Sequence, residues 1–408
     1  MSVAGNKRRL QTTQGFYRNY VKKFYDDAHR AKKEKKPVAW VASTFPIEML
    51  QAMEVTPVWP ENYASVCAAR QVSLRLCEAA ERAGFSKDLC SYARCVLGSI
   101  FEEKDLPEGG LPKPDFLVAS TGACDTHFKW FQVASRRLNR PLFLLDIPYD
   151  TTGAQAPEDY QVKHYVTQLD ELISFLEGQI GKQFDMNRLR TVERLSDRTS
   201  KLWMEIQDCR KAVPAPMNAR DAFSTVFFML CIPGSEISIK FYEKLRDELK
   251  ERVKDGVGAI EDEKHRVIWD NLPMWFNLRF FNHLNSLGAV IVAETFSHVW
   301  AGDLNPSKPL ESLAKKYLPN FANAVAERRI NLILRLIREW RVDGVILPTN
   351  WGCRMMSIGM TLLKKVIRKE LGVPSLILNI DSTDWRNYNE AHVKTEIEAF
   401  IEMLRRKG

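Results

Sequence analysis

The chain has 408 residues, of which 45% are hydrophobic and 27% are charged, and its formal net charge is +8. This length exceeds what one ordinary hydrophobic core serves, so we expect two or three domains of globular composition. The composition excludes membrane-spanning segments, because the longest apolar run, around residues 226–232, is too short to cross a bilayer.

Basic residues gather near the start of the chain, at 7–9 and 22–36, where acidic residues accompany them. A solvated helical face explains this pattern better than a docking surface for an acidic partner. No basic stretch carries the interleaved aromatic residues that single-stranded nucleic acid requires, so no nucleic-acid partner is predicted. The polar start lacks the apolar core of a secretion signal, so we expect a cytoplasmic protein whose eight cysteines are reduced.

In chain order, residues 1–37 are predicted to form a helical arm that ends at Pro37. Residues 38–157 are predicted to form an α/β domain, because short apolar strands alternate with helices. Its four strands are expected within residues 37–46, 55–62, 116–120 and 142–147. Helices are expected between them at 47–53, 64–83 and 86–100, the last with Ser86 as its N-cap.

Residues 158–262 show helical periodicity without strand runs and are predicted to be a helical bridge. Residues 263–408 repeat the element order of the first domain and end in an amphipathic helix at 390–407. Strands are expected there at 265–273, 289–295, 345–348 and 375–380. The sequence therefore predicts two similar parallel-sheet domains of the flavodoxin or Rossmann-like α/β kind.

Two cysteines occupy corresponding places in these domains. Cys124 lies in TGACDTHFKW (121–130) and Cys353 in NWGCRMMS (350–357), each between a strand end and a helix start. The free N–H groups at a helix start favour a thiolate, so both are candidate ligands to a metal or an iron–sulfur cluster. A small core residue at a tight turn is the alternative. Cys90, near another helix start, is a candidate third thiolate.

Three thiolates on one cubane would leave one iron open to a substrate oxygen, whereas a structural zinc site would require a fourth protein ligand. His127 follows Cys124 by three residues and could approach the site, but a place on a helix surface is the preferred prediction. The remaining cysteines are predicted to be core residues: Cys67, Cys77, Cys95, Cys209 and Cys231.

Ser43 and Glu61 follow the first and second strands and should lie at the same sheet edge as Cys124. There they can anchor a substrate and move a proton, and a turn or helix-capping role explains them equally well. The sequence contains no P-loop, no G-x-G-x-x-G after the first strand, no H-E-x-x-H and no G-x-S-x-G. These absences exclude the corresponding motif-based nucleotide, zinc and hydrolase chemistries.

Taken together, six segments resemble the 2-hydroxyacyl-CoA dehydratase / benzoyl-CoA reductase family over nearly the whole chain. They are STFP (43–46), WPEN (59–62), DLCSYAR (88–94), TGACDTHFKW (121–130), DIPYD (146–150) and NWGCRMMS (350–357). The resemblance implies that Cys90, Cys124 and Cys353 hold a [4Fe–4S] cluster with one open iron site between the two domains. It implies that Ser43 contacts a substrate oxygen and that Glu61 is an acid/base or hydroxyl-orienting group. The presence of Ser43 and Glu61 favours the catalytic, α-like subunit of the D-component over its partner subunit.

The resemblance also implies a reaction and partners. The chain would be a lyase subunit that removes water from an (R)-2-hydroxyacyl-CoA to give an enoyl-CoA. A separate ATP-hydrolysing iron–sulfur activator would inject one electron, which the cluster passes to the thioester carbonyl, and the resulting ketyl radical would expel the 2-hydroxyl group. A homologous second subunit would complete a heterodimer.

The sequence leaves three alternatives open. The first is a subunit of an ATP-dependent aryl- or enoyl-CoA reductase of the same family. The second is a homodimeric electron-transfer or reductase protein with a double-cubane cluster. The third is a two-domain α/β protein without any cluster.

Overall fold

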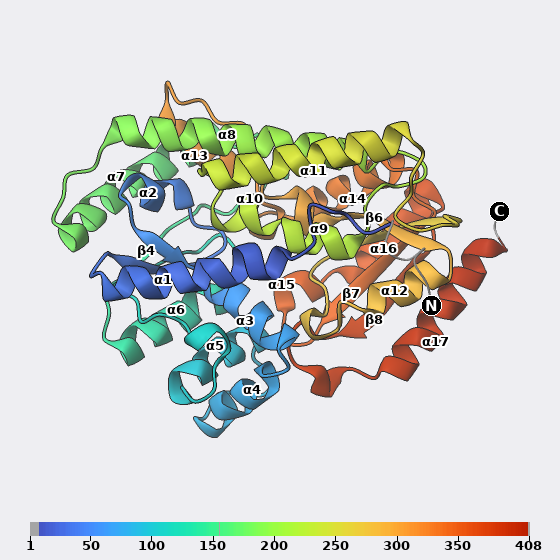
Figure 1. Cartoon of the computed structure of the whole chain (residues 1–408), viewed down its shortest axis with the longest axis horizontal. Helices are drawn as coiled ribbons and strands as arrows, with labels where there is room; N and C mark the ends of the chain where they lie inside the picture. The colour runs from blue at the N-terminus through green and yellow to red at the C-terminus, as the bar shows by residue number, and fades with distance from the viewer. Residues whose placement is uncertain (1–7, 155, 407–408) are drawn as a thin grey trace.

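The computed structural model describes residues 8–154 and 156–406. Residues 1–7 of the predicted arm, residue 155 of the predicted first domain and residues 407–408 at the predicted last helix lie outside the described residues. The described chain forms two α/β halves, with the blue and cyan half beside the orange and red half (Figure 1). The predicted α/β class is confirmed.

Each half contains a four-stranded parallel sheet with the same strand order, which confirms the repeat that the sequence predicts. The first sheet has the order β2-β1-β3-β4 and the second β6-β5-β7-β8. All residues of β1 and β3 are buried, as expected for parallel strands covered on both faces. The strands of the first sheet are β1 (Val38–Val41), β2 (Thr56–Val58), β3 (Phe116–Ser120) and β4 (Leu142–Leu145). Those of the second are β5 (His265–Trp269), β6 (Ala289–Glu294), β7 (Gly344–Asn350) and β8 (Ser375–Ile380).

Helices cover both sheets and connect the halves. The first half carries η2 (Tyr17–Lys22), α1 (Lys23–Lys33), α2 (Ile47–Ala52), α3 (Pro60–Ala69), α4 (Ser73–Arg82), α5 (Ser91–Phe101) and α6 (Asp125–Leu138). The middle of the chain forms α7 (Asp159–Ile180), α8 (Met186–Cys209), α9 (Ala219–Thr225), α10 (Phe227–Cys231) and α11 (Glu236–Lys254). The second half adds α12 (Phe280–Ser286), η5 (Thr295–His298), α13 (Pro309–Tyr317), α14 (Ala326–Glu339), α15 (Arg354–Ser357), α16 (Met360–Leu371) and α17 (Glu390–Arg405).

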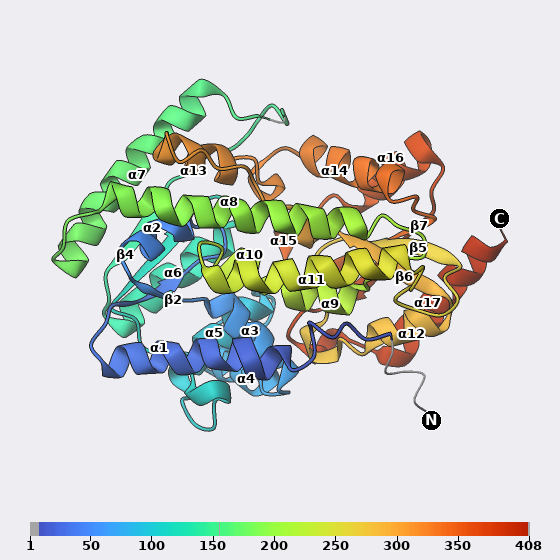
Figure 2. The same cartoon turned by 45° about the horizontal axis from the view of Figure 1, so that its top comes forward.

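The two long helices α8 and α11 lie side by side and extend across both halves in both views (Figures 1 and 2). Helix α13 lies beside α7 in the same views, and its Leu313 and Ala314 belong to the hydrophobic core of the first half. The chain of the second half therefore returns to pack on the first. The boundaries 1–37, 38–157, 158–262 and 263–408 stay a prediction.

Three predicted elements have other limits in the structure. The helix expected at 64–83 is divided into α3 and α4, because Gln71 adopts a positive φ of 60° between them. The strand expected to reach residue 62 ends at Val58, because Pro60 occupies the first turn of α3. The Ser86 hydroxyl accepts the N–H of Asp88 in a turn, and α5 begins later with Cys90 as its N-cap residue.

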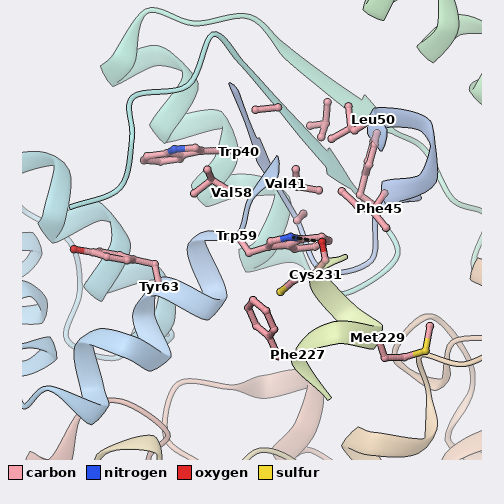
Figure 3. Close-up of a cluster of buried hydrophobic side chains, with 14 of the residues drawn as sticks. Trp40, Val41, Phe45, Leu50, Val58, Trp59, Tyr63, Phe227, Met229 and Cys231 are labelled. Atoms are coloured by element: carbon pink, nitrogen blue, oxygen red, sulfur yellow. Dashed lines mark hydrogen bonds between the residues drawn. The ribbon is translucent and has the colours of Figure 1, made fainter. Parts of the chain in front are cut away.

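The core of the first half joins the bridge helices to the first sheet. Figure 3 shows Trp59 and Phe227 beside residues of β1 and β2, and the Trp59 Nε1–H donates to the carbonyl oxygen of Cys231 at 3.2 Å. Each of these side chains is at most 4% exposed. Burial of large aromatic side chains contributes about 1.5–3 kcal/mol each. This packing fixes α10 and the carboxyl edge of the first sheet relative to each other.

Candidate functional site

All five predicted site residues line one cavity of about 430 Å³. Ser43 follows β1, Glu61 lies in the first turn of α3 after β2, and Cys124 follows β3. Cys353 comes from the other half, where it follows β7, and Cys90 precedes α5. The cavity therefore lies where the carboxyl edges of the two sheets face each other, which is where ligands bind in open parallel sheets.

Each of the three cysteines is the N-cap residue of a helix: Cys90 of α5, Cys124 of α6 and Cys353 of α15. Backbone N–H groups of the following residues lie near each sulfur and lower the thiol pKa. All three side chains are half-buried. The thiols also lie close enough to one another for their charges to interact.

The helix starts lower the pKa of the three thiols, as the sequence predicts, but burial has a larger and opposite effect. Burial, the largest effect, together with the neighbouring Cys90, raises the pKa of Cys124 to about 12 despite the nearby N–H groups. Burial likewise raises the pKa values of Cys90 and Cys353. Loss of solvation therefore outweighs the helix N-termini at these three sulfurs.

The five other cysteines lie where the sequence predicts. Four are buried in the core, and Cys209 is half-buried against the same core. Burial raises the pKa of Cys77 and Cys209, so these thiols stay protonated and unreactive.

Glu61 is held by two donors through one carboxylate oxygen. Its Oε1 accepts the backbone N–H of Ser43 at 3.0 Å and contacts Nε2 of His127. Its Oε2 is buried and has no hydrogen-bond partner among the described residues. Ser43 is half-buried, and its neighbour Thr44 is buried and bonded to the Ser120 hydroxyl at 2.6 Å. Oε2 is therefore the carboxylate oxygen whose hydrogen-bonding capacity is unused among the described residues.

The prediction that His127 lies on a helix surface is wrong. Its side chain is 7% exposed, contacts Glu61 and packs beside the rings of Trp130 and Phe131. In the first turn of α6, the residue three positions after the N-cap returns to the cap's side of the helix. The spacing of three residues from Cys124 was the sequence signal that His127 turns toward the site. Only the tertiary structure, which brings Glu61 in α3 against α6, shows that the imidazole contacts a carboxylate.

Sequence reasoning missed several residues of the cavity wall. Tyr92 and Trp275 lie on opposite halves, and the Trp275 Nε1–H donates to the Tyr92 hydroxyl. Asn271, just beyond β5, also lines the cavity. No short motif surrounds these residues, so only the approach of the halves places them at the site. Apolar side chains form much of the remaining wall, among them Phe223, Val226, Phe227, Leu278, Phe296 and Val299.

Polar contacts fix the two halves together beside the cysteines. Arg94 in α5 is fully buried and donates to Asp384, beyond β8, at 2.8 Å and to Glu81 at 2.6 Å. The Ser91 hydroxyl, next to Cys90, donates to Asp381 at 2.5 Å. The start of α5 is therefore held by the second half as well as by its own.

Within residues 8–154 and 156–406, none of the helices combines the length and apolar character that a bilayer crossing needs. A sequence profile described as 2-hydroxyglutaryl-CoA dehydratase, D-component, matches residues 42–404. The chain is 30% identical over 384 residues to the (R)-phenyllactyl-CoA dehydratase alpha subunit of Clostridium sporogenes, covering 92% of each chain. It is 28% identical over 383 residues to the (R)-2-hydroxyisocaproyl-CoA dehydratase alpha subunit of Clostridioides difficile, covering 93% of each.

A relative with a different activity is also similar to this chain. The chain is 28% identical over 381 residues to a benzoyl-CoA reductase subunit of Thauera aromatica, covering 88% of this chain and 87% of the relative. The profile match extends over most of the sequence, and the family is the one that the cysteine segments resemble. The chain therefore belongs to the 2-hydroxyglutaryl-CoA dehydratase, D-component family and is an enzyme subunit of that type.

Proposed function

We propose that this chain is the catalytic, α-like subunit of an ATP-activated dehydratase that converts an (R)-2-hydroxyacyl-CoA into an enoyl-CoA through a ketyl radical. One observation carries the proposal: thiols from both halves line the same cavity as the predicted substrate-binding residues Ser43 and Glu61. The relatives named as alpha subunits of 2-hydroxyacyl-CoA dehydratases support this assignment. Their names also support a homologous beta subunit as partner, and an ATP-hydrolysing activator would deliver the electron.

The donor set suits a [4Fe–4S] cluster with one open iron, held by Cys90, Cys124 and Cys353. No three described His, Cys, Asp or Glu side chains converge closely enough to hold a single metal ion. A cubane does not require such convergence, because each thiolate binds a different iron. The backbone N–H groups near the sulfurs would stabilise the charge of the bound cluster. When bound, the cluster would supply one-electron chemistry and a Lewis-acidic iron.

The chain's own residues would orient the substrate and move its protons. Glu61 keeps Oε1 fixed by Ser43 and His127, which leaves Oε2 to accept a hydrogen bond or a proton from the substrate. The Ser43 hydroxyl, at the same edge, would contact a substrate oxygen. His127 would act as a positioning residue, because it contacts Glu61 while its ring packs beside Trp130 and Phe131.

The wall of the cavity favours an apolar acyl group. Aromatic and aliphatic side chains from η2, α9, α10 and η5 contribute to it, and Arg220 is the one lysine or arginine among the described lining residues. An apolar chain gains about 25 cal/mol for each Å² removed from water, whereas a carboxylate requires a cation, and Arg220 is the single one that the described wall offers. We therefore expect aryl or branched aliphatic 2-hydroxyacyl-CoA esters to react better than 2-hydroxyglutaryl-CoA.

Anaerobic purification with the co-purifying partner, followed by iron and sulfide analysis, tests the proposal first. About four irons and about four sulfides per chain are expected for one cubane. Dehydration of (R)-phenyllactyl-CoA and (R)-2-hydroxyisocaproyl-CoA should then require activator, ATP and reductant. Absence of iron after reconstitution, or no dehydration by an iron-loaded preparation, would refute it.

The similarity to the benzoyl-CoA reductase chain favours a second candidate, an ATP-dependent reductase. A reductase leaves its electrons in the product and consumes reductant stoichiometrically, whereas a dehydratase recovers the electron. Reductant consumed per product therefore separates the two. A clearly higher iron content in a preparation that contains only this chain would instead favour the double-cubane protein.

A further inference from the structure

Some buried polar groups without partners belong to residues in the wall of the cavity. Four such atoms belong to lining residues and have no hydrogen-bond partner in the described part of the chain: Glu61 Oε2, Trp130 Nε1, Asn271 Nδ2 and Trp300 Nε1. An unsatisfied buried donor or acceptor costs about 1–3 kcal/mol, so proteins retain few of them. The four in the wall of this cavity match a polar ligand that offers both a donor and acceptors.

Asn271 is the counterpart of Ser43 in the second sheet. Ser43 lies two residues beyond the end of β1, and Asn271 lies two residues beyond the end of β5. Asn271 is fully buried, and its φ of +89° is one that few residues other than glycine adopt readily. Strained conformations of this kind persist where the surrounding structure enforces them, often at functional sites.

The orientation of the Asn271 amide is fixed by the backbone. The N–H of Leu272 donates to Oδ1 at 2.6 Å, which identifies the other amide atom as the nitrogen. Nδ2 is therefore the group that lacks a partner among the described residues. Asn271 lines the cavity, and the hydrogen-bonding capacity of this nitrogen is unused among the described residues.

A chain of hydrogen bonds connects Asn271 to the helix that follows Cys353. The Asn271 N–H donates to the Thr295 hydroxyl at 2.9 Å, and this hydroxyl donates to Asp270 at 2.6 Å. Arg329 contacts Asp270 at 2.6 Å and donates to the carbonyl oxygen of Met356, in the helix after Cys353, at 3.0 Å. The amide is thus rigidly placed relative to a predicted cluster ligand.

We propose that Asn271 is a substrate-binding residue whose Nδ2–H donates to an oxygen of the 2-hydroxythioester group of the acyl-CoA. This inference rests on the proposed function. A 2-hydroxythioester offers one O–H donor and two oxygen acceptors. Glu61 Oε2 matches the donor and Asn271 Nδ2 matches an acceptor, so the two halves of the chain bind opposite sides of the same small group.

Two variants remove the donor without requiring a new backbone conformation. N271D keeps the size of the side chain and an oxygen for Leu272, and N271G suits the positive φ. N282D changes an exposed asparagine on α12 and serves as the matched control. Binding is measured anaerobically on the iron-loaded complex with its partner, without activator or ATP, so that no turnover occurs.

The probes are (R)-phenyllactyl-CoA and (R)-2-hydroxyisocaproyl-CoA, each compared with the analogue that lacks the 2-hydroxyl group. The dissociation constant of the hydroxylated esters should rise about 10- to 100-fold in both Asn271 variants and stay unchanged in N282D. An equal rise for the analogues assigns the bond to the thioester carbonyl oxygen. A rise confined to the hydroxylated esters assigns it to the 2-hydroxyl oxygen.

Unchanged affinity in folded N271D or N271G, judged by an unaltered melting temperature and iron content, would overturn the role of Asn271 and leave the proposed function intact. Failure of the wild-type complex to bind any of these esters would instead overturn the proposed function, and the role of Asn271 with it. The two failures are therefore distinguishable.

Discussion

The contact between the two halves beside Cys90 predicts a large effect for D384N. Asp384 is 1% exposed, and its Oδ2 accepts from Arg94 Nη1 at 2.8 Å and from Arg386 Nη2 at 2.6 Å. Although burial opposes its charged form, the hydrogen bonds from Arg386 and Arg94 outweigh that cost and lower the pKa of Asp384. An asparagine there places N–H groups against guanidinium N–H groups, whichever way the amide turns.

The magnitude follows from the burial of Arg94, which is 0% exposed. Removing one partner of a buried ion pair costs about 3–5 kcal/mol, because the other charge stays buried. Glu81 remains 2.6 Å from Arg94 and keeps part of the pairing, so we expect a loss near the lower limit, about 3 kcal/mol. Since Arg94 lies in the helix that follows Cys90, the iron content should fall as well.

Urea unfolding at neutral pH and iron analysis measure these two effects. E390Q is the matched control, because Glu390 pairs with Lys394 at 2.7 Å on an exposed surface, where such a pair contributes less than about 1 kcal/mol. The reasoning is refuted if D384N loses no more stability than E390Q. A D384N protein that loses stability and keeps its full iron content would refute only the link to Cys90.

Three further predictions concern single residues. Iron analysis and the dehydration assay should show that C124S loses iron and activity together, whereas C209S keeps both. A full iron content in C124S would exclude Cys124 as a ligand. E61Q should keep its iron but lose about 10²–10⁴ in kcat, the range for a lost acid/base group, and near wild-type kcat would contradict that role. Burial and the nearby Glu48 raise the pKa of Glu193 to about 8, so the folded state keeps a proton that the unfolded state releases from about pH 4.5. The free energy of unfolding is therefore highest below pH 4.5 and falls as the pH rises to 8. At pH 8, E193Q should be more stable than the wild type by roughly 3–5 kcal/mol, as measured by urea unfolding. Equal stability of the two proteins would disprove this.

Local patterns in the sequence were sufficient for the α/β class and for the edge of the sheet at which the candidate residues lie. A strand buried on both faces must be apolar throughout, and a ligand-binding loop at its carboxyl end needs small residues before a helix. Both signals are present around Cys124 and Cys353, so the repeat of two parallel sheets was predictable. Helix limits were less accurate, because Gln71 takes a backbone conformation that no glycine marks.

Contacts between distant segments were decided only by the tertiary structure. His127 meets Glu61, and Arg94 meets Asp384, because α3 and the loop after β8 are brought against helices that are far away in the chain. The protonation of the thiols also depends on the fold: helix starts favour the thiolate, but burial by surrounding elements is larger and raises the pKa of Cys124. Sequence by itself therefore determined the kinds of groups at each strand end, whereas their partners and their charge depend on solvent exclusion and packing between the two halves.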